Sequence, residues 1–350
     1  MKDLDEEIGQ LFMCGMPGTV LDEETERLIR DYNPGGIILF ARNIEGPVQV
    51  ATLCRDLQEA ALKYHGKPLF LGVDQEGGRV ARLREPFTSF PGNAAIGADE
   101  HPVEKAIEFG RVTAMEMKLV GLNMDLAPVV DVRRGEIEKH LDGRSFGEDP
   151  EKVALLGRSV IQSLQRNGIM AVAKHFPGLG RADLDPHFHL PRIGIDSREL
   201  MSVNIPPFRA AIEAGVTGVM TSHAVYPALD PNLPATLSSP VLTNLLRSEL
   251  GFRGLVLTDD LEMGAIAKTW GVAEGAAGSF AAGADLLLIC KEQQLVEQSA
   301  ELIRKRIEAG VIPLRRLEET SERIGAAKTA FLPHRQERSF AEIGEYFGIA

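Results

Sequence analysis

Eight short runs of apolar residues recur along this chain of 350 residues, and each is followed by a longer segment of helical period. Within each run the residues are mostly apolar at consecutive rather than alternating positions. Such runs indicate strands that are buried on both faces of a parallel sheet. The predicted strands cover residues 11–14, 36–40, 69–73, 124–127, 169–173, 216–221, 255–258 and 285–289.

Amphipathic segments lie between these runs, and several have Asp, Ser or Pro near the start and Gly just past the end, as helix caps require. The predicted helices cover residues 23–32, 47–64, 103–120, 153–167, 198–214, 294–309 and 313–329. Eight strands that alternate with helices predict a closed (β/α)8 barrel, the TIM barrel. The alternative is an open doubly wound sheet, but a dinucleotide-binding sheet of that kind would carry G-x-G-x-x-G after its first strand, and none is present.

Neither an internal repeat nor a linker divides the sequence, so we expect one barrel domain over residues 1–332 and a C-terminal extension over residues 333–350. The formal net charge of −12 argues against general binding to nucleic acid or to an anionic membrane. Cys14, Cys54 and Cys290 are far apart and odd in number, which indicates buried thiols rather than disulfides or metal ligands. With no signal peptide and no membrane-spanning run, the chain is predicted to be cytoplasmic, and nothing in it indicates an obligate protein partner.

Ionisable or polar residues follow the predicted strands one after another. They are Asp74, Glu76, Arg79 and Arg82, then Asp131 and Arg144, then Lys174 and His175, then Ser222 and His223, then Asp259 and Asp260. In an α/β barrel the carboxyl ends of the strands meet at one rim, where the active site lies. The pattern therefore predicts a single site at that rim.

Two groups, one from this pattern and one from the loop that follows Lys174 and His175, suit the hydrolysis of a glycoside. Asp259 is the candidate nucleophile, because a carboxylate can attack the acetal carbon and form a covalent glycosyl ester in a retaining enzyme. Its neighbour Asp260 is expected to cap a helix that begins near Leu261. His187 is the candidate proton donor, with Asp185 orienting its ring.

Seven ordered motifs extend this interpretation. They are residues 73–80 (Val-Asp-Gln-Glu-Gly-Gly-Arg-Val), 144–147 (Arg-Ser-Phe-Gly), 174–178 (Lys-His-Phe-Pro-Gly), 185–187 (Asp-Pro-His), 220–223 (Met-Thr-Ser-His), 234–238 (Pro-Ala-Thr-Leu-Ser) and 258–261 (Thr-Asp-Asp-Leu). Together, over roughly residues 8–330, they resemble glycoside hydrolase family 3, and in particular its single-domain β-N-acetylhexosaminidases of bacterial peptidoglycan recycling.

The resemblance implies a (β/α)8 fold, retention of configuration, and no metal or organic cofactor. It implies that Asp259 is the nucleophile and that Asp185 and His187 form the acid/base pair. The residues that it places around the terminal sugar are Asp74, Arg82, Arg144, Lys174 and His175. The expected substrate is a terminal β-linked N-acetylglucosamine, as in muropeptide fragments of the cell wall.

Three positions depart from the usual family pattern. Leu179 and Arg181 stand where the family has His and Asp, and Pro186 stands between the two members of the acid/base pair, where Ser is usual. Proline fixes its own φ and favours an extended conformation in Asp185, so the loop is expected to be stiffer. These departures bear on the motion of the loop and on the preference for the leaving group.

Other functions stay open at the level of sequence. Within the family, a β-glucosidase, a β-xylosidase or a phosphorylase with an imidazole acid/base would use the same groups. A metal-dependent amidohydrolase would use His187, His189, Lys174, His223 and Asp259 as ligands, but it needs its H-x-H motif after the first strand. His189 is otherwise expected to be an exposed loop residue. A sugar-binding protein without activity is the remaining alternative.

Overall fold

A computed structural model describes residues 4–135, 141–182, 184–332 and 339–349. Its centre is a parallel sheet with the strand order β10-β1-β2-β3-β6-β7-β8-β9. The strands are β1 (Phe12–Cys14), β2 (Gly36–Leu39), β3 (Phe70–Val73), β6 (Met124–Asp125), β7 (Met170–Phe176), β8 (Gly218–Thr221), β9 (Leu255–Leu257) and β10 (Leu287–Ile289). A parallel bridge between Leu257 and Leu286 joins the two ends of this order, and the Thr258 amide donates to the Leu286 carbonyl at 2.9 Å.

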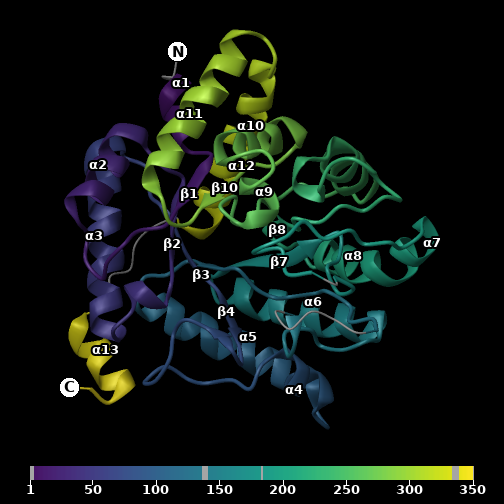
Figure 1. Cartoon of the computed structure of the whole chain (residues 1–350). Helices are drawn as coiled ribbons and strands as arrows, with labels where there is room; N and C mark the ends of the chain where they lie inside the picture. Colours follow the sequence, from purple (N-terminus) through teal and green to yellow (C-terminus); the bar gives the residue numbers. More distant parts are fainter. Residues whose placement is uncertain (1–3, 136–140, 183, 333–338, 350) are drawn as a thin grey trace.

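The sheet therefore closes into the predicted (β/α)8 barrel, with the helices around it (Figure 1). All eight predicted strands are present, each shifted by a few residues at most. Every residue of these strands is buried, because the barrel interior packs against one face and the helices against the other. Strand β7 continues past its apolar run, so that Lys174 and His175 belong to the strand itself.

The helices also follow the sequence closely. They are α1 (Leu4–Gly9), α2 (Glu23–Tyr32), α3 (Pro47–His65), α4 (Asn93–Ala98), α5 (Pro102–Leu119), α6 (Pro150–Arg166), α7 (Ser197–Glu199), α8 (Ile205–Glu213), α9 (Gly264–Ala267), α10 (Val272–Ala282), α11 (Gln293–Glu308), α12 (Leu314–Phe331) and α13 (Phe340–Phe347). Short 3-10 helices, η1 (Ala41–Asn43) and η4 (Ala235–Leu237), and π-helices, η3 (Leu200–Asn204) and η5 (Pro240–Glu249), complete the set. None of the helices in the described ranges is long and apolar enough to cross a membrane.

The helix caps explain several boundaries. The Asp22 side chain accepts a hydrogen bond from the Thr25 amide at 2.8 Å and starts α2. Gly66 ends α3 in the left-handed conformation, with φ 63°.

The predicted helix over residues 198–214 is wrong as a single element. The structure has α7, the π-helix η3 and α8 there instead. Pro206 and Pro207 lie at the start of α8 and have no N–H groups to continue an α-helical pattern from the preceding turn, which accounts for the break.

A small antiparallel hairpin covers part of the barrel mouth. It consists of β4 (Gln75–Gly77) and β5 (Val80–Ala81), and it follows β3 directly. The Gln75 side chain accepts from the Arg82 amide at 2.9 Å and from the Leu83 amide at 3.0 Å, which ties the two ends of the hairpin together. Gly78 has φ 60°, and a Cβ atom there would lie 3.1 Å from the Pro91 carbonyl oxygen. The hairpin thereby holds Asp74, Glu76 and Arg82 near one another.

The C-terminal extension ends in helix α13, which lies against α3 (Figure 1). Ile343 is buried in this contact, and the Phe347 ring packs edge-on against Phe87 with 4.8 Å between the ring centroids. Residues 333–338 and 350 of the predicted extension lie outside the described residues. The division of the chain at residue 332 stays a prediction.

Candidate active site

A cavity of about 380 Å³ lies at the carboxyl ends of the barrel strands. Seven of the eight residues that the sequence singled out line it: Asp74, Arg82, Arg144, Lys174, His175, His187 and Asp259. The eighth, Asp185, is hydrogen-bonded to His187. The structure thus brings together side chains that follow β3, β6 and β9 with side chains from the end of β7 and the loop after it, as expected for the rim of a barrel.

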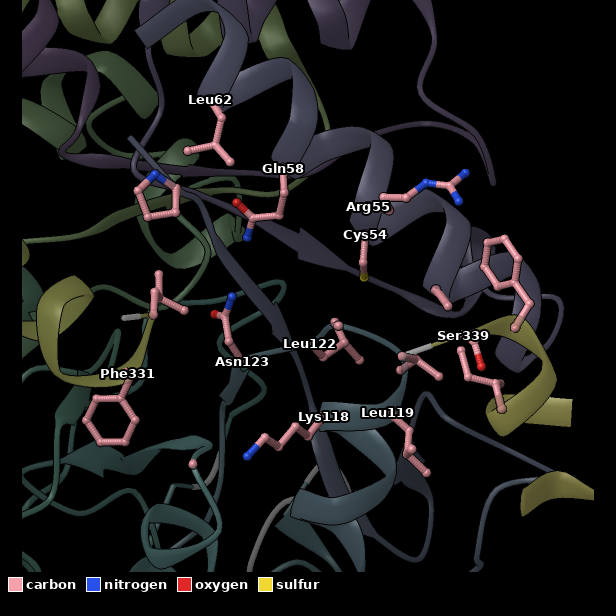
Figure 2. A pocket seen from close by; sticks show the side chains of 18 of the residues that line it. Cys54, Arg55, Gln58, Leu62, Lys118, Leu119, Leu122, Asn123, Phe331 and Ser339 are labelled. Carbon is pink, nitrogen blue, oxygen red and sulfur yellow. The ribbon is translucent and has the colours of Figure 1, made fainter. Parts of the chain in front are cut away.

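A larger cavity, about 1190 Å³, lies elsewhere and contains none of these residues (Figure 2). It is lined by α3, by the end of α5, by residues just before β3 and β6, and by α13. Its polar side chains Gln58 and Asn123 hydrogen-bond to backbone groups of Leu69 and Leu71. Because its polar groups serve the fold and no titratable cluster converges there, the smaller cavity is the candidate active site.

Charged side chains form a continuous network on one wall of the smaller cavity. Lys174 Nζ lies 2.7 Å from Asp74 Oδ1 and 2.7 Å from Glu76 Oε1. Arg144 donates to both Glu76 oxygens, with both nitrogen–oxygen distances at 2.8 Å. Arg82 approaches the second oxygen of Asp74 at 3.4 Å.

The network keeps Glu76 and Lys174 charged. Burial alone would raise the pKa of Glu76, but Lys174 and Arg144 hold it well below its usual range. Burial would lower the pKa of Lys174, but Asp74 and Glu76 raise it above its usual range. The Asp74 side chain is 16% exposed whereas that of Glu76 is 1% exposed, so Asp74 is the carboxylate that a ligand can reach.

His175 is oriented by Asp131. Its Nδ1 lies 2.7 Å from Asp131 Oδ2, and the amides of His175 and Leu179 donate to Asp131 Oδ1 at 3.2 and 2.7 Å. A carboxylate only accepts, so Nδ1 carries the proton. The other ring nitrogen, Nε2, lies 3.5 Å from the Arg144 guanidinium. The ring therefore presents a fixed tautomer to the cavity.

Asp259 follows the end of β9, and its Oδ1 accepts a hydrogen bond from the Asp260 amide at 2.8 Å. Burial raises the pKa of Asp259, but the imidazoles of His223 and His175 outweigh this effect and place it below its usual value. The side chain is therefore a carboxylate at neutral pH, the form that a nucleophile requires.

His223 is a buried neighbour of Asp259 that comes from the segment after β8. Its Nε2 lies 2.9 Å from the Asp260 carbonyl oxygen, which can only accept, and its Nδ1 lies 2.7 Å from Thr236 Oγ1. Burial lowers the pKa of His223, with Asp259 opposing this shift. His223 thus fixes the backbone next to the candidate nucleophile.

The expected helix-capping role of Asp260 is wrong. Helix α9 begins at Gly264 with Met263 at its N-cap, and Asp260 Oδ1 instead accepts from the Glu262 amide at 3.1 Å. The acidic side chain forms a local turn rather than a cap. Burial raises the pKa of Asp260 to about 7.

Asp185 and His187 form a hydrogen-bonded pair. His187 Nδ1 lies 2.7 Å from Asp185 Oδ1, and the same oxygen accepts from the His187 amide at 2.9 Å. The carboxylate fixes Nδ1 as the protonated nitrogen, so proton exchange with a ligand would use Nε2. The His187 side chain is 56% exposed and lines the same cavity as Asp259.

Leu179, Arg181 and Pro186, the three positions that depart from the usual family pattern, differ in whether they line the cavity. Leu179 and Pro186 are buried and line the cavity. Arg181 pairs with Glu199 at 2.7 Å and is not part of the cavity wall, so its charge is directed away from the site. His189 is exposed and likewise does not line the cavity.

From the sequence alone, Glu76, Asp131 and Thr236 have no assigned role, and His223 enters only as a ligand in the amidohydrolase alternative. Glu76, Asp131 and His223 do follow predicted strands, which is a usable signal, but their pairings across the barrel mouth are invisible in the sequence. Thr236 had no signal beyond its place in a motif. Among the described residues, no group of three or more His, Cys, Asp or Glu is arranged to hold a metal ion.

Comparison with known proteins identifies the class. The model of the glycosyl hydrolase family 3 N-terminal domain matches residues 3–327. A β-hexosaminidase of Thiobacillus denitrificans is 38% identical over 294 residues, which cover 82% of this chain and 79% of that protein. A family 3 β-N-acetylglucosaminidase from Paenibacillus sp. str. FPU-7 has a TM-score of 0.94 and 36% identity, covering 99% of this chain and 68% of that one.

A second solved structure, a β-N-acetylhexosaminidase from Beutenbergia cavernae, has a TM-score of 0.87 and 29% identity, covering 94% of this chain and 99% of that one. The barrel, its rim of acidic and basic groups and these relatives define a glycoside hydrolase. The chain belongs to glycosyl hydrolase family 3, which confirms the resemblance seen in the sequence and sets aside the amidohydrolase alternative.

Proposed function

We propose that this protein is a retaining β-N-acetylhexosaminidase that removes terminal β-linked N-acetylglucosamine through a covalent glycosyl-aspartate. The observation that carries the proposal is that the Asp259 carboxylate and the Asp185-paired imidazole of His187 line one cavity. The names of the most similar relatives, β-hexosaminidase and β-N-acetylglucosaminidase, support the choice of sugar.

The reaction proceeds in two steps. First, Asp259 attacks the anomeric carbon, while His187 gives the proton on Nε2 to the glycosidic oxygen and the bond to the leaving group breaks. Asp185 stabilises the ring and its positive charge. In the second step His187 takes a proton from water, which attacks the anomeric carbon and releases Asp259 as a carboxylate. Two displacements give retention of configuration.

The network of charged side chains on one wall of the cavity holds the sugar during both steps. Asp74 accepts hydrogen bonds from sugar hydroxyls, and Lys174 and Arg144 donate to sugar oxygens from positions that Glu76 fixes. Arg82 and His175 complete this wall. The matched charges suit a neutral, hydroxyl-rich ligand, because no large net charge faces it.

We propose muropeptide fragments released during cell-wall recycling as the natural substrates, and the cytoplasm as the compartment. The buried positions of Cys14, Cys54 and Cys290 support a reducing compartment. The β-hexosaminidase relatives in bacteria support the choice of a bacterial N-acetylglucosaminide.

The test is hydrolysis of para-nitrophenyl N-acetyl-β-glucosaminide beside para-nitrophenyl β-glucoside and β-xyloside. The N-acetylated substrate should have the highest kcat/KM, and its product should have the β configuration when first formed. A preference for the plain glucoside or xyloside would show that the substrate is not an N-acetylglucosaminide, but it would leave the proposed mechanism unchanged. An initial α product would contradict the mechanism.

A phosphorylase is the second candidate, because the proposed acid/base is an imidazole rather than a carboxylate. A carboxylate would repel an incoming phosphate more strongly than a neutral imidazole does, and His187 is exposed enough to meet one. Product analysis with and without phosphate decides between the two. Formation of the sugar 1-phosphate would favour the phosphorylase.

A further inference from the structure

The loop that carries His187 is hydrogen-bonded to the segment that follows Asp259. The Gly264 amide donates to the His187 carbonyl oxygen at 2.9 Å, and the Ala265 amide donates to the Pro186 carbonyl oxygen at 3.1 Å. Gly264 and Ala265 are the first two residues of α9, so their N–H groups have no partner within that helix. The two loops of the proposed acid/base and nucleophile are therefore joined through their backbones.

This contact requires a residue without a side chain at position 264. A Cβ atom on Gly264 would lie 2.8 Å from the His187 carbonyl oxygen and 3.0 Å from that of Phe188. Both are backbone atoms, so relief requires the whole loop to move. Gly264 does not have a positive φ, and its backbone conformation is open to any residue. Close approach is thus the reason that glycine is needed here.

The segment that follows Asp259 is itself fixed to the barrel. The buried residue Leu261 donates its amide to the carbonyl oxygen of Leu288, a residue of strand β10, at 3.0 Å. A third bond to the loop comes from Lys268, whose Nζ lies 3.0 Å from the Phe188 carbonyl oxygen. The loop is therefore held at three successive carbonyl groups, 186, 187 and 188.

We propose that Gly264 is a positioning residue for His187: it lets the acid/base loop dock on the nucleophile's own segment and sets the place of the imidazole in the cavity. This proposal rests on the role of His187 proposed above. Pro186 also contributes to this docking. Its ring fixes φ in the residue whose carbonyl oxygen accepts the hydrogen bond from the Ala265 amide. Docking then defines the geometry of the acid/base before substrate binds.

The test is Gly264→Ala, with activity measured on two substrates. Para-nitrophenolate leaves without a proton, whereas the sugar leaving group of N,N′-diacetylchitobiose needs one. We expect kcat/KM for the disaccharide to fall by at least about 10-fold, part of the roughly 10²–10⁴-fold that general acid catalysis contributes. For the para-nitrophenyl substrate kcat/KM should change by less than about 3-fold, since its bond cleavage does not depend on the acid.

Three further variants test the positioning role of Gly264. Gly325→Ala, in α12 with no atom within 4 Å of the added Cβ, is the matched control and should leave both rates unchanged. Lys268→Met removes one bond to the loop and should show the selective loss in weaker form. Hydrogen exchange at residues 187–189 should rise in Gly264→Ala, with an unchanged midpoint of thermal unfolding. His187→Ala provides the reference for full loss of the acid.

The outcomes separate the two proposals. Equal losses on both substrates in Gly264→Ala, or no loss on the disaccharide, overturn the positioning role, while a selective loss in His187→Ala keeps the proposed function intact. Equal losses on both substrates in His187→Ala overturn the acid/base role, and the positioning role falls with it.

Discussion

Glu76 links Lys174 and Arg144, the two cations closest to it in the charged network. Its carboxylate lies 2.7 Å from Lys174 Nζ and accepts two hydrogen bonds from Arg144, and its side chain is 1% exposed. Removing one partner of a buried charge network leaves the others without compensation. We expect Glu76→Gln to lower the free energy of unfolding by about 3–5 kcal/mol, as for other broken buried ion pairs.

Urea unfolding measures this loss, and Glu301→Gln is the matched control. Glu301 pairs with Arg304 on the surface, where its side chain is 43% exposed. Its loss should change the free energy of unfolding far less than the loss of Glu76 does, because solvent screens an exposed ion pair. Similar effects for the two variants would show that the network around Glu76 is not a buried one.

Asp260 makes stability depend on pH. Burial raises its pKa to about 7 in the folded protein, whereas an aspartate in the unfolded chain has its ordinary pKa of 3.8. The folded state therefore binds the proton more tightly, so this group's contribution is complete below about pH 4 and is lost as the pH rises to about 7. Asp260→Asn cannot titrate and should not show this loss.

The measurement is thermal unfolding of both proteins between pH 4 and pH 8. The midpoint of the parent protein should fall relative to that of Asp260→Asn as the pH rises, and the difference should level off above about pH 7. A pKa difference of one unit between the folded and unfolded states corresponds to about 1.4 kcal/mol of stability. Even part of the expected shift would therefore change the midpoint measurably. A difference that does not vary with pH would contradict the raised pKa.

At the scale of single residues, the sequence was informative about which side chains belong to the site and poor about their pairings. Asp74, Lys174 and Asp259 could be found because each follows an apolar strand, and the barrel brings strand ends together. The bond between Asp74 and Lys174 joins residues 100 positions apart, and no local pattern encodes it. The same is true of Asp131, whose partner His175 lies 44 positions further on.

At the scale of elements, α13 is a short helix with a single buried anchor. Ile343 is 1% exposed, whereas Ile349, just after the same helix, is 45% exposed. We expect Ile343→Ala to lower the free energy of unfolding by about 2 kcal/mol, at the low end for a buried isoleucine because the helix can settle onto α3. Ile349→Ala should change it by less than about 0.5 kcal/mol.

Urea unfolding of both variants, with hydrogen exchange over residues 339–349, tests this contact. Exchange in α13 should rise in Ile343→Ala alone. If exposed Ile349 proved as sensitive as Ile343, the helix would not be anchored as the structure shows.

The strands and long helices were predictable because their signal is local. Consecutive apolar residues mark the strands, and caps such as Asp22 and Gly66 mark the helix ends. The segment at residues 197–213 was not predicted correctly, because two prolines lie inside an amphipathic pattern that otherwise indicates one helix. The structure divides this segment into three helical pieces. The hairpin β4–β5 was also missed, since its strands are too short to show a period.

At the scale of the whole molecule, closure of the barrel explains why one site exists. Strand β1 pairs with both β10 and β2, so the first and last strands of the chain are neighbours. Residues that follow β3, β6 and β9, and residues from the end of β7 and the loop after it, then surround a single cavity, although they come from distant parts of the chain. The sequence predicted this arrangement through the number of strands, and the order of strands in the sheet confirms it.

The central claim is that Asp259 becomes covalently bonded to the sugar. The most direct measurement is mass spectrometry of peptides after reaction with a fluorinated N-acetylglucosaminide that slows hydrolysis of the intermediate. We expect one glycosyl group per chain, attached to Asp259, and no label in Asp259→Asn. A label on another residue, or a labelled Asp259→Asn variant, would contradict it.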